Sequence, residues 1–517
     1  MTKNTELYDL VHSLSKPEKR FFKLFASLND KDGTNQYVRL FVKIDRQKIC
    51  NEEAIRKHFA GEKTGEHFAE AKYYLYQTII KALHIFHTEH SIDSQIEMMR
   101  HLAEILLNKK LYEQARKIIT KGKELAKLHT RYAHYMELMR WEFHLILVET
   151  DRERIEERLE VYFTELFDIM DAEYNTVRYW RLHLKMYYLE TLHGSPHNTE
   201  ELVPFVEIMN DTLMQDSTKA ITPVSITYFY LNKAIFASIS GDYAEALIWN
   251  KTLLTQMQSS PIWSESTTKL IIPMFSNICL ISIKATDEQT FWEFYPKLCE
   301  LTEAGTSQEY LRWRVKALAH LPNLYAHIGE FEKAKTEYTT FREVFDSFEG
   351  KLRFGEAAHL DLLGFIISFA LGEYKKCIEY LQGLLNVRST SWSQEVYFQA
   401  KILLIVTHYE LNNWDVVESL VKSAQKYISS HKGLDEFELL FFDFCRKSLR
   451  AVSDIERRNV AAEFYPKIAA LKSQPLWSSL FQYFDYAAWL KSHTCSLDFA
   501  RIVRECYLET HTVAQVY

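Results

Sequence analysis

Three histidines near residue 87 have the spacing that comes closest to a metal site. His84, His87 and His90 form an H-x-x-H-x-x-H run at the expected end of a helix. His90 lies about 240° around such a helix from His84, so one helix cannot direct all three rings at one ion. Histidines at a helix C-terminus also interact favourably with the helix dipole. We therefore expect neither a metal site nor a cofactor here.

The segment 61–65 has the sequence G-E-K-T-G and superficially resembles a phosphate-binding loop. It lacks the Gly-Lys-Ser/Thr order and a preceding strand, which that loop requires. The motifs H-E-x-x-H, G-x-S-x-G and G-x-G-x-x-G do not occur in the chain. The sequence thus predicts a protein that is not an enzyme. Its many single Ser, His and Asp residues leave an unrecognised catalytic site as an alternative.

Two rows of residues at helical spacing are the best candidates for contact with a partner. The first row is Tyr174, Arg178, Arg181 and Lys185, and the second is Arg312, Lys316, Asn323 and His327. Cations aligned on one helix face could bind a peptide carboxylate or a phosphate if that face lines a groove. The alternative is an ordinary solvated helix face, on which such rows are common.

The elements that position these residues are expected to be helices. Gly and Pro number only 14 and 10 among 517 residues, whereas aromatic residues make up 14%. So few turn-forming residues exclude most sandwiches, barrels and Gly-rich loops, and they exclude a disordered chain. Large aromatic side chains fill helix interfaces, so we assign most of them to the core. The composition predicts an all-α protein with short connections.

The remaining totals indicate a cytoplasmic protein. The longest apolar run is too short to span a bilayer, and residues 1–10 do not form a signal peptide, so we expect no membrane contact. The seven cysteines include no C-x-x-C pair and are expected to be free thiols. The net charge of −7 is divided into +6 for residues 1–130 and −13 for residues 131–517. Such asymmetry can mark a nucleic-acid surface, although long helices often show it by chance.

A short phrase recurs along the chain and predicts helical hairpins. It consists of a small or turn-forming residue, any residue, an aromatic, two mostly polar residues and usually a small residue, beginning at Lys110, Gly241, Gly329, Gly372 and Asn412. The spacings fit multiples of about 42 residues, with weaker turns expected near Glu153, Gly194 and Gln289. The pentapeptide E-F-Y-P-K at 293–297 recurs at 463–467, four such periods later. A turn residue with positive φ would end each first helix, and the aromatic would start the second.

These phrases resemble the hairpin of tetratricopeptide repeats. Two hairpins carry the family pattern best, through Ala234, Gly241, Tyr243 and Ala246, and through Tyr325, Gly329, Phe331 and Ala334. The resemblance implies a right-handed α-α superhelix whose concave groove, lined by the first helices, binds a partner. The units here are longer than the family's 34 residues. Pro296, Pro322 and Pro466 are expected to kink their helices, which makes the solenoid irregular.

The first 90 residues lack the phrase and are expected to form a separate helical domain, with the solenoid over residues 91–517. Ser15 to Glu18 is a capping-box pattern that predicts a helix start. Further helices are expected near 36–47, 51–60 and 67–87. Together with the repeat, this N-terminus is similar to that of uncharacterised bacterial tetratricopeptide-like proteins. Its short helices and basic residues can also be interpreted as a helix-turn-helix module.

The sequence therefore favours a non-catalytic scaffold that binds a protein or peptide in the groove of its solenoid. The alternative is a cytoplasmic transcription regulator, in which residues 1–90 bind DNA and the solenoid acts as a sensor. Nucleic acid is the less favoured partner, because no helix rich in Arg, Asn, Gln and Ser stands out in residues 1–90.

Overall fold

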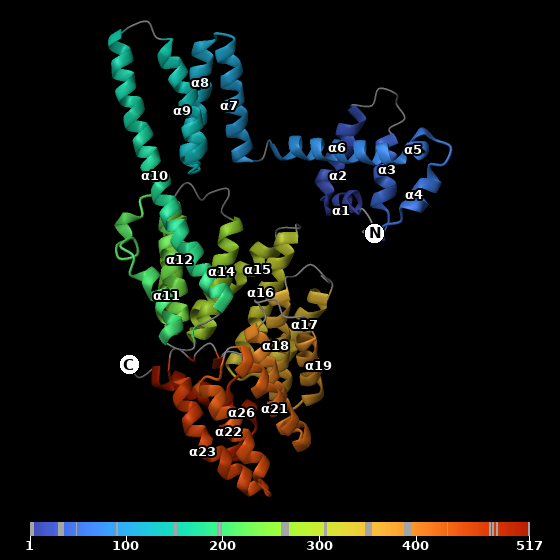
Figure 1. Ribbon diagram of the computed structural model, residues 1–517, viewed down its shortest axis with the longest axis vertical. Coiled ribbons are helices and arrows are strands. Elements are labelled where there is room, and N and C mark those ends of the chain that lie inside the picture. Colours follow the sequence, from blue (N-terminus) through green and yellow to red (C-terminus); the bar gives the residue numbers. More distant parts are fainter. Residues whose placement is uncertain are drawn as a thin grey trace. The chain divides into compact units, whose positions relative to one another are not determined.

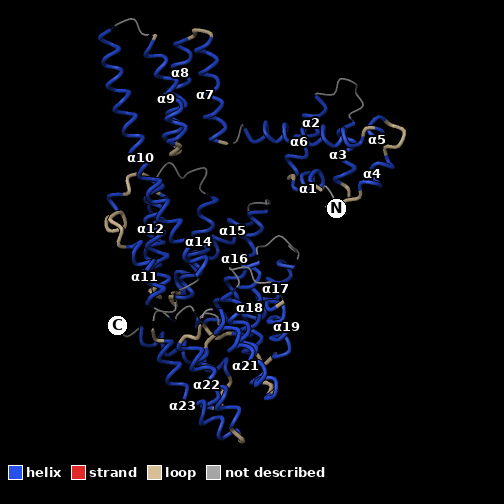
Figure 2. Tube along the Cα trace, in the orientation of Figure 1, coloured by secondary structure: helices blue, strands red, loops and turns tan. Residues whose placement is uncertain are grey.

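A computed structural model shows a chain built from α-helices (Figure 1). The structure describes residues 5–28, 36–47, 49–88, 91–148, 152–193, 196, 199–259, 268–303, 308–346, 354–386, 394–431, 433–474, 477, 480–481 and 484–514. No strand occurs among these residues, and short loops join the helices (Figure 2). Consecutive helices pack against each other, so the predicted all-α superhelical solenoid is confirmed.

The internal contacts divide the chain into two units, residues 1–174 and 175–517. The helices of the first unit are α1 Glu6–Ser13, α2 Lys16–Leu28, α3 Gln36–Asp45, α4 Glu52–His58, α5 Lys63–Glu66, α6 Phe68–Thr88, α7 Ile92–Asn108, α8 Tyr112–Leu128, α9 Tyr132–Leu147 and the first part of α10 Arg152–His193. Helices α1 to α6 share one hydrophobic core, and α7 to α10 share another. The sequence placed its boundary between these two cores, whereas the division by contacts falls inside α10.

The predicted helix starts in the first 90 residues agree with the structure. The backbone N–H of Ser15 donates to Glu18 Oε2 at 2.7 Å, and the N–H of Glu18 donates to Ser15 Oγ at 3.4 Å, which is the reciprocal pair of a capping box. Helices α2, α3, α4 and α6 begin within one residue of the predicted positions. The short helices α1 and α5 were not predicted.

The second unit is a stack of helical hairpins. After the last part of α10, its helices are α11 Thr199–Met209, a 3₁₀ turn at Ser217–Lys219, α12 Pro223–Ile239, α13 Tyr243–Gln258, α14 Thr268–Lys284, α15 Glu288–Glu303, α16 Gln308–His327, α17 Phe331–Asp346, α18 Phe354–Ala370, α19 Tyr374–Leu385, α20 Gln394–Glu410, α21 Trp414–His431, α22 Glu436–Arg450, α23 Asp454–Lys472, α25 Tyr486–Cys495 and α26 Phe499–Ala514. The strongest contacts join the two helices of each hairpin, such as α12 with α13.

All five predicted hairpin turns are present. Their turn residues have positive φ angles between 56° and 78°: Lys110, Gly241, Gly329, Gly372 and Asn412. In each turn the next N–H donates back to a carbonyl five residues earlier, as from Asp242 to Ala237 at 2.9 Å. The aromatic residue of every phrase is the first residue of the second helix. The predicted turn near Gln289 is found at Thr286, whereas Gly194 lies outside the described residues.

The repeated pentapeptide builds the same local structure twice. Phe294 in α15 makes an edge contact with Phe275 of the preceding helix, and Phe464 in α23 makes one with Phe444. In both copies the lysine that ends the pentapeptide lies over the phenylalanine ring, at 5.0 and 4.5 Å from its centre. Four hairpins separate α15 from α23, which supports the period read from the sequence. Pro296 and Pro466 lie inside these helices, which are continuous through them; the predicted kinks stay predictions.

The C-terminal helices α25 and α26 do not add a further hairpin to the end of the stack. They extend back along the turns of four earlier hairpins. Trp489 and His493 contact Glu410 at one turn, and Phe499 packs on Phe369 at the next. Arg504 then donates a hydrogen bond to the carbonyl of Ile328 at 2.9 Å, and the Tyr507 hydroxyl donates one to Glu288. We call α25 and α26 the C-terminal strap.

Candidate interaction surface

Helix α10 carries the first predicted row of contact residues. Its inward face is held by apolar packing: Ile169 belongs to the core of the first unit, and Tyr179 and Met186 are completely buried in the core of the second. The Tyr179 hydroxyl donates to the carbonyl of Leu213 at 2.8 Å, which fixes that face further. Within each unit, most side chains of α10 that do not contact the core of that unit are exposed.

The structure places all four residues of the first row among these exposed side chains. Tyr174, Arg178, Arg181 and Lys185 are exposed, and their spacing of four, three and four residues aligns them along the helix. Their role in binding stays a prediction.

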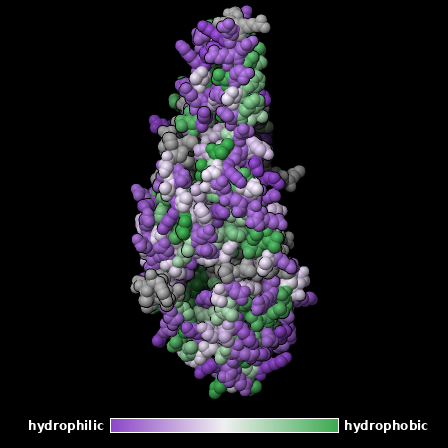
Figure 3. Space-filling view, turned by 90° about the vertical axis from the view of Figure 1, so that its left-hand side faces the viewer, coloured by the Kyte–Doolittle hydropathy of each residue, from purple (hydrophilic) through white to green (hydrophobic). Residues whose placement is uncertain are grey.

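Among the exposed apolar residues of α10, the sequence analysis singled out only Tyr174. Ten large hydrophobic side chains of α10 are between 43% and 64% exposed: Val161, Phe163, Phe167, Met170, Tyr174, Val177, Trp180, Leu184, Tyr187 and Tyr188. We assigned aromatic residues mainly to the core, and α10 is the exception. On the face drawn in Figure 3, hydrophobic residues are interspersed with hydrophilic ones. An exposed apolar row of this kind is a candidate interaction site.

Seven of these residues, together with Arg181, follow a heptad pattern that the sequence contains. Steps of four and three residues alternate through Phe163, Phe167, Met170, Tyr174, Val177, Arg181, Leu184 and Tyr188. In coiled-coil notation, 167, 174, 181 and 188 are a positions, and 163, 170, 177 and 184 are d positions. We call these eight residues the α10 seam. A seam of this spacing is the surface by which one helix packs along another.

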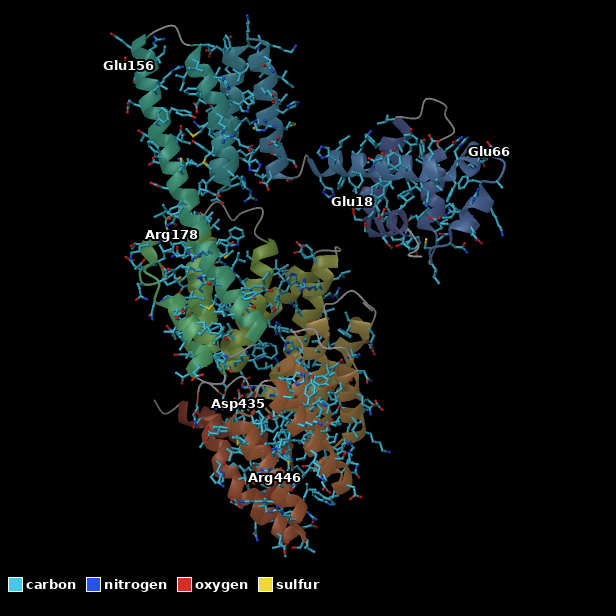
Figure 4. All side chains as sticks on the ribbon, viewed as in Figure 1. Glu18, Glu66, Glu156, Arg178, Asp435 and Arg446 are labelled. Atoms are coloured by element: carbon cyan, nitrogen blue, oxygen red, sulfur yellow. The ribbon has the colours of Figure 1, made fainter. Side chains whose placement is uncertain are left out.

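The two halves of α10 differ in charge. Residues 152–174 contain eight acidic and three basic side chains, a net charge of −5, whereas residues 175–193 contain one acidic and three basic, a net charge of +2. Figure 4 labels Glu156 in the acidic half and Arg178 in the basic half. Asp171 and Arg178 both flank the seam at e positions, and both are exposed. The surface is therefore apolar along its centre and of opposite sign at its two ends.

The second predicted row lies on α16 and is less accessible. Arg312, Lys316 and Asn323 are half-buried, and only His327 is exposed. Lys316 lies 4.6 Å from the centre of the Trp313 ring, and His327 lies 6.2 Å from the ring of Tyr507 in the strap. The side chains of this row therefore take part in packing within the chain. Its role in partner binding stays a prediction.

Next to this row, α16 buries a titratable side chain. His320 Nε2 lies 2.9 Å from Ser276 Oγ of α14 in a hydrogen bond. Burial, together with the smaller effect of the nearby charge of Lys316, lowers the pKa of His320 to about 4. The imidazole is therefore neutral at pH 7 and holds α16 to α14 through a hydrogen bond. The described residues around it include no further group placed for proton transfer to a substrate.

A second polar cluster ties α8, α9 and α10 together. Lys123 Nζ donates hydrogen bonds to Glu142 at 2.6 Å and to Glu165 at 2.7 Å, and the Tyr135 hydroxyl donates another to Glu165. Burial alone would raise the pKa of Glu165, but the hydrogen bonds from Lys123 and Tyr135 lower it overall. All four groups satisfy one another, so this arrangement stabilises helix packing and offers no reactive group to a ligand.

A small hollow lies beside Lys401. Its volume of about 180 Å³ is lined mainly by apolar residues of α19, α20 and α21, and typical ligand pockets are larger, about 300 to 1,000 Å³. Lys401 lies 5.0 and 4.9 Å from the rings of Tyr397 and Tyr427, and burial lowers its pKa. The cation is thus stabilised by aromatic rings, and no nucleophile and base converge at this position among the described residues.

Metal ligation and membrane insertion have no support in the described part of the chain. None of its helices is long and apolar enough to cross a bilayer, and no group of three or more His, Cys, Asp or Glu side chains is placed to hold a metal ion. His84 and His87 are exposed on α6, and His87 pairs with Glu18 at 2.7 Å. His90 lies outside the described residues. No model of a known protein family matches the chain, and a search of curated proteins gave no match.

Proposed function

We propose that this protein is a non-catalytic scaffold of the tetratricopeptide-like kind, which binds other protein chains. The observation that carries the proposal is the α10 seam, an exposed apolar row with Arg178, Arg181 and Lys185 beside or within it. Burying such a row removes apolar area from water, and the flanking charges give specificity. All seven cysteines are unpaired in the structure, which supports a reducing compartment such as the cytoplasm.

Site-specific photo-crosslinking tests this function. A photoreactive amino acid placed at Phe167 or Leu184 should link the scaffold covalently to a partner chain in its native cells. The same group at Ile248, an isolated exposed apolar residue on α13, serves as the matched control. Linked species from both seam positions and none from Ile248 support the proposal. Equal yields at all three positions, or no linked species at the seam, contradict it.

DNA binding by residues 1–90 is the second function that the sequence left open. Several basic side chains of this domain already pair with acidic ones: Lys19 with Asp45 at 2.6 Å, and Arg39 with Glu62 at 2.9 Å. A phosphate would have to compete with these carboxylates, so the ion pairs favour the scaffold over the regulator. Electrophoretic mobility shifts with duplex DNA at low salt would test the alternative, because binding to phosphates weakens steeply as salt rises.

A further inference from the structure

We propose that the hollow beside Lys401 binds a small aromatic monocarboxylate, with the carboxylate on the Lys401 ammonium group and the ring among the apolar side chains of the hollow. The hollow lies within the second unit, on helices that the α10 seam does not include. The inference therefore goes beyond the proposed function and does not depend on it. Three observations carry it: the walls of the hollow, a cation that has no acidic partner among the described residues, and a volume that fits one ring.

Faces of two neighbouring helices form the walls of the hollow. Tyr397, Lys401 and Leu404 follow one another at steps of four and three residues, which aligns them along one face of α20. On α21, Leu420 and Ser423 are three residues apart and line the hollow as well. One leucine of α19 and one alanine of α21 complete the lining. The walls are therefore apolar except for a tyrosine, a serine hydroxyl and the lysine ammonium.

Lys401 provides the positive charge of the hollow. Its side chain is half-buried, and its Nζ lies 5.0 and 4.9 Å from the ring centres of Tyr397 and Tyr427. These ring centres are 5.2 Å apart, so the two rings together position the ammonium group. Burial lowers the pKa of Lys401, and no acidic group in the described part of the chain offsets that effect.

Two other lysines show how this chain stabilises a cation that is withdrawn from solvent. Lys123 Nζ donates hydrogen bonds to two glutamates, and Lys335 Nζ donates one to Glu373 at 2.7 Å. Withdrawing a cation from water is costly unless an anion pairs with it. A carboxylate bound in the hollow would give Lys401 the counter-ion that Lys123 and Lys335 obtain from the chain.

Ser423 offers a second donor to the same carboxylate. The hydroxyls of Thr407 and Ser430 donate hydrogen bonds to carbonyls three or four residues earlier in their own helices. The exposed Ser423 hydroxyl makes no such bond within the part of the chain that the structure describes. A carboxylate has two oxygens that accept hydrogen bonds. It can therefore accept from the Lys401 ammonium and from the Ser423 hydroxyl together.

The volume of the hollow selects the rest of the ligand. The hollow measures about 180 Å³, and an apolar protein cavity of about 150 Å³ is large enough to bind benzene. One aromatic ring that carries a carboxylate therefore fits, whereas a nucleotide is too large. Inorganic phosphate would match the charge of Lys401 but would leave Leu404 and Leu420 in contact with water. A ring placed against these leucines removes apolar surface from water.

Calorimetric titration of the full chain with benzoate tests the inference. We expect one benzoate to bind per chain. Benzyl alcohol has the same ring without the charge, and it should bind at least about tenfold more weakly because it loses the charge-assisted hydrogen bond to Lys401. Lys401→Met should weaken benzoate binding by a similar factor and leave benzyl alcohol little changed. Lys401→Arg keeps the charge and should retain most of the affinity for benzoate.

A second lysine provides the matched control. Lys467 lies 4.5 Å from the centre of the Phe464 ring, as Lys401 lies near its two tyrosines, but it does not line the hollow. Lys467→Met removes the same charge and should leave benzoate binding unchanged. Circular dichroism confirms that each variant is folded. Equal affinities for benzoate and benzyl alcohol, or benzoate binding that Lys401→Met leaves intact, would overturn the inference.

Chemical labelling of the unmodified chain locates the bound anion. An amine-reactive acylating reagent, read out by mass spectrometry, reports how accessible and how deprotonated each lysine is. Benzoate should slow the acylation of Lys401, because the anion covers its ammonium group and favours the protonated form. Acylation of Lys426, which is exposed on the same helix as Ser423, should not change. Equal effects of benzoate on both lysines, or none on Lys401, would count against the site.

A third ligand separates a free acid from the end of a peptide. N-acetylphenylalanine presents a carboxylate and a ring with a peptide bond attached, as the last residue of a peptide does. Binding that is at least about tenfold tighter than that of benzoate would assign the hollow to a peptide end and overturn the free acid. None of these measurements involves α10. The crosslinking test of the scaffold can therefore fail while benzoate binds, and it can succeed while benzoate does not.

Discussion

Replacing Gly329 by alanine should release the C-terminal strap from the hairpin stack. Gly329 forms the turn between α16 and α17 with a φ of 78°, and its backbone lies directly against α26. A Cβ atom at this position would be 2.8 Å from both the Cα and the N of Arg504. These are backbone atoms, so the clash cannot be relieved by rotating a side chain, and α26 must move. Gly372 forms the equivalent turn two helices later, with a φ of 72°, and a Cβ there meets no atom within 4 Å.

Comparing the two alanine variants separates two contributions to the loss of stability. Both alanine variants should lose about 1 kcal/mol of folding stability, because an L-residue is strained at positive φ. Only Gly329→Ala adds the overlap with Arg504, for which overpacking typically costs about 1 to 3 kcal/mol. The strap also loses the hydrogen bond from Arg504 to the carbonyl of Ile328 if α26 moves away. We therefore expect amide exchange in α26 to be at least tenfold faster in Gly329→Ala than in Gly372→Ala.

Hydrogen exchange followed by mass spectrometry measures this difference, since it resolves peptides from α26 separately. A local measurement is needed because a chain of two units need not unfold in one step. The reasoning is refuted if both variants exchange equally in α26, or if Gly372→Ala releases the strap and Gly329→Ala does not. Circular dichroism should show little change in helix content for either variant.

Three further substitutions test the buried polar groups. The buried His320 has a pKa of about 4, so between pH 6.5 and 4 the unfolded chain takes up a proton at this position and the folded chain does not. The free energy of unfolding should therefore fall by ~2 kcal/mol from pH 7.5 to 5. Denaturant titration should show a smaller fall for His320→Gln. Glu410→Gln should weaken the hydrogen bonds that hold α25, which speeds amide exchange there several-fold. Lys123→Met should destabilise the first unit by about 2 kcal/mol in thermal melts, because two carboxylates lose their cation. The exposed Lys121→Met should change the melting temperature little.

The hairpins could be predicted because their signals are local. A glycine or asparagine at positive φ followed by an aromatic two residues later identifies both the end of one helix and the start of the next. Thr130 and Ser496 also adopt positive φ at helix ends. Neither residue is typical of this backbone conformation, so composition gave no sign of their turns. The strap could not be predicted either, because its contacts join residues such as Glu288 and Tyr507 that are 219 positions apart.

The candidate surface could have been predicted more fully than it was. The spacing from Phe163 to Tyr188 is visible in the sequence as alternating steps of four and three. Of its eight members we read only Tyr174 and Arg181, because an apolar side chain on a helix is usually turned to the core. The structure shows that Tyr179, Met186 and Ile169 are among the buried side chains of α10, and the sequence alone does not reveal which residues of a helix are buried. On α16 the opposite holds: the row is regular in sequence, but Trp313 and the strap cover part of it.

The strap also makes the order of synthesis matter. In an open array each hairpin contacts only its neighbours, so hairpins can fold one after another as they leave the ribosome. Here the turns at Asp287, Gly329 and Gly372 receive their covering residues from α26, which is synthesised after all of them. Every nascent chain therefore passes through a stage in which the stack is folded and its turns are uncovered, and that stage ends only after α26 has been synthesised. Chaperones and proteases that meet the protein during translation meet this uncovered form.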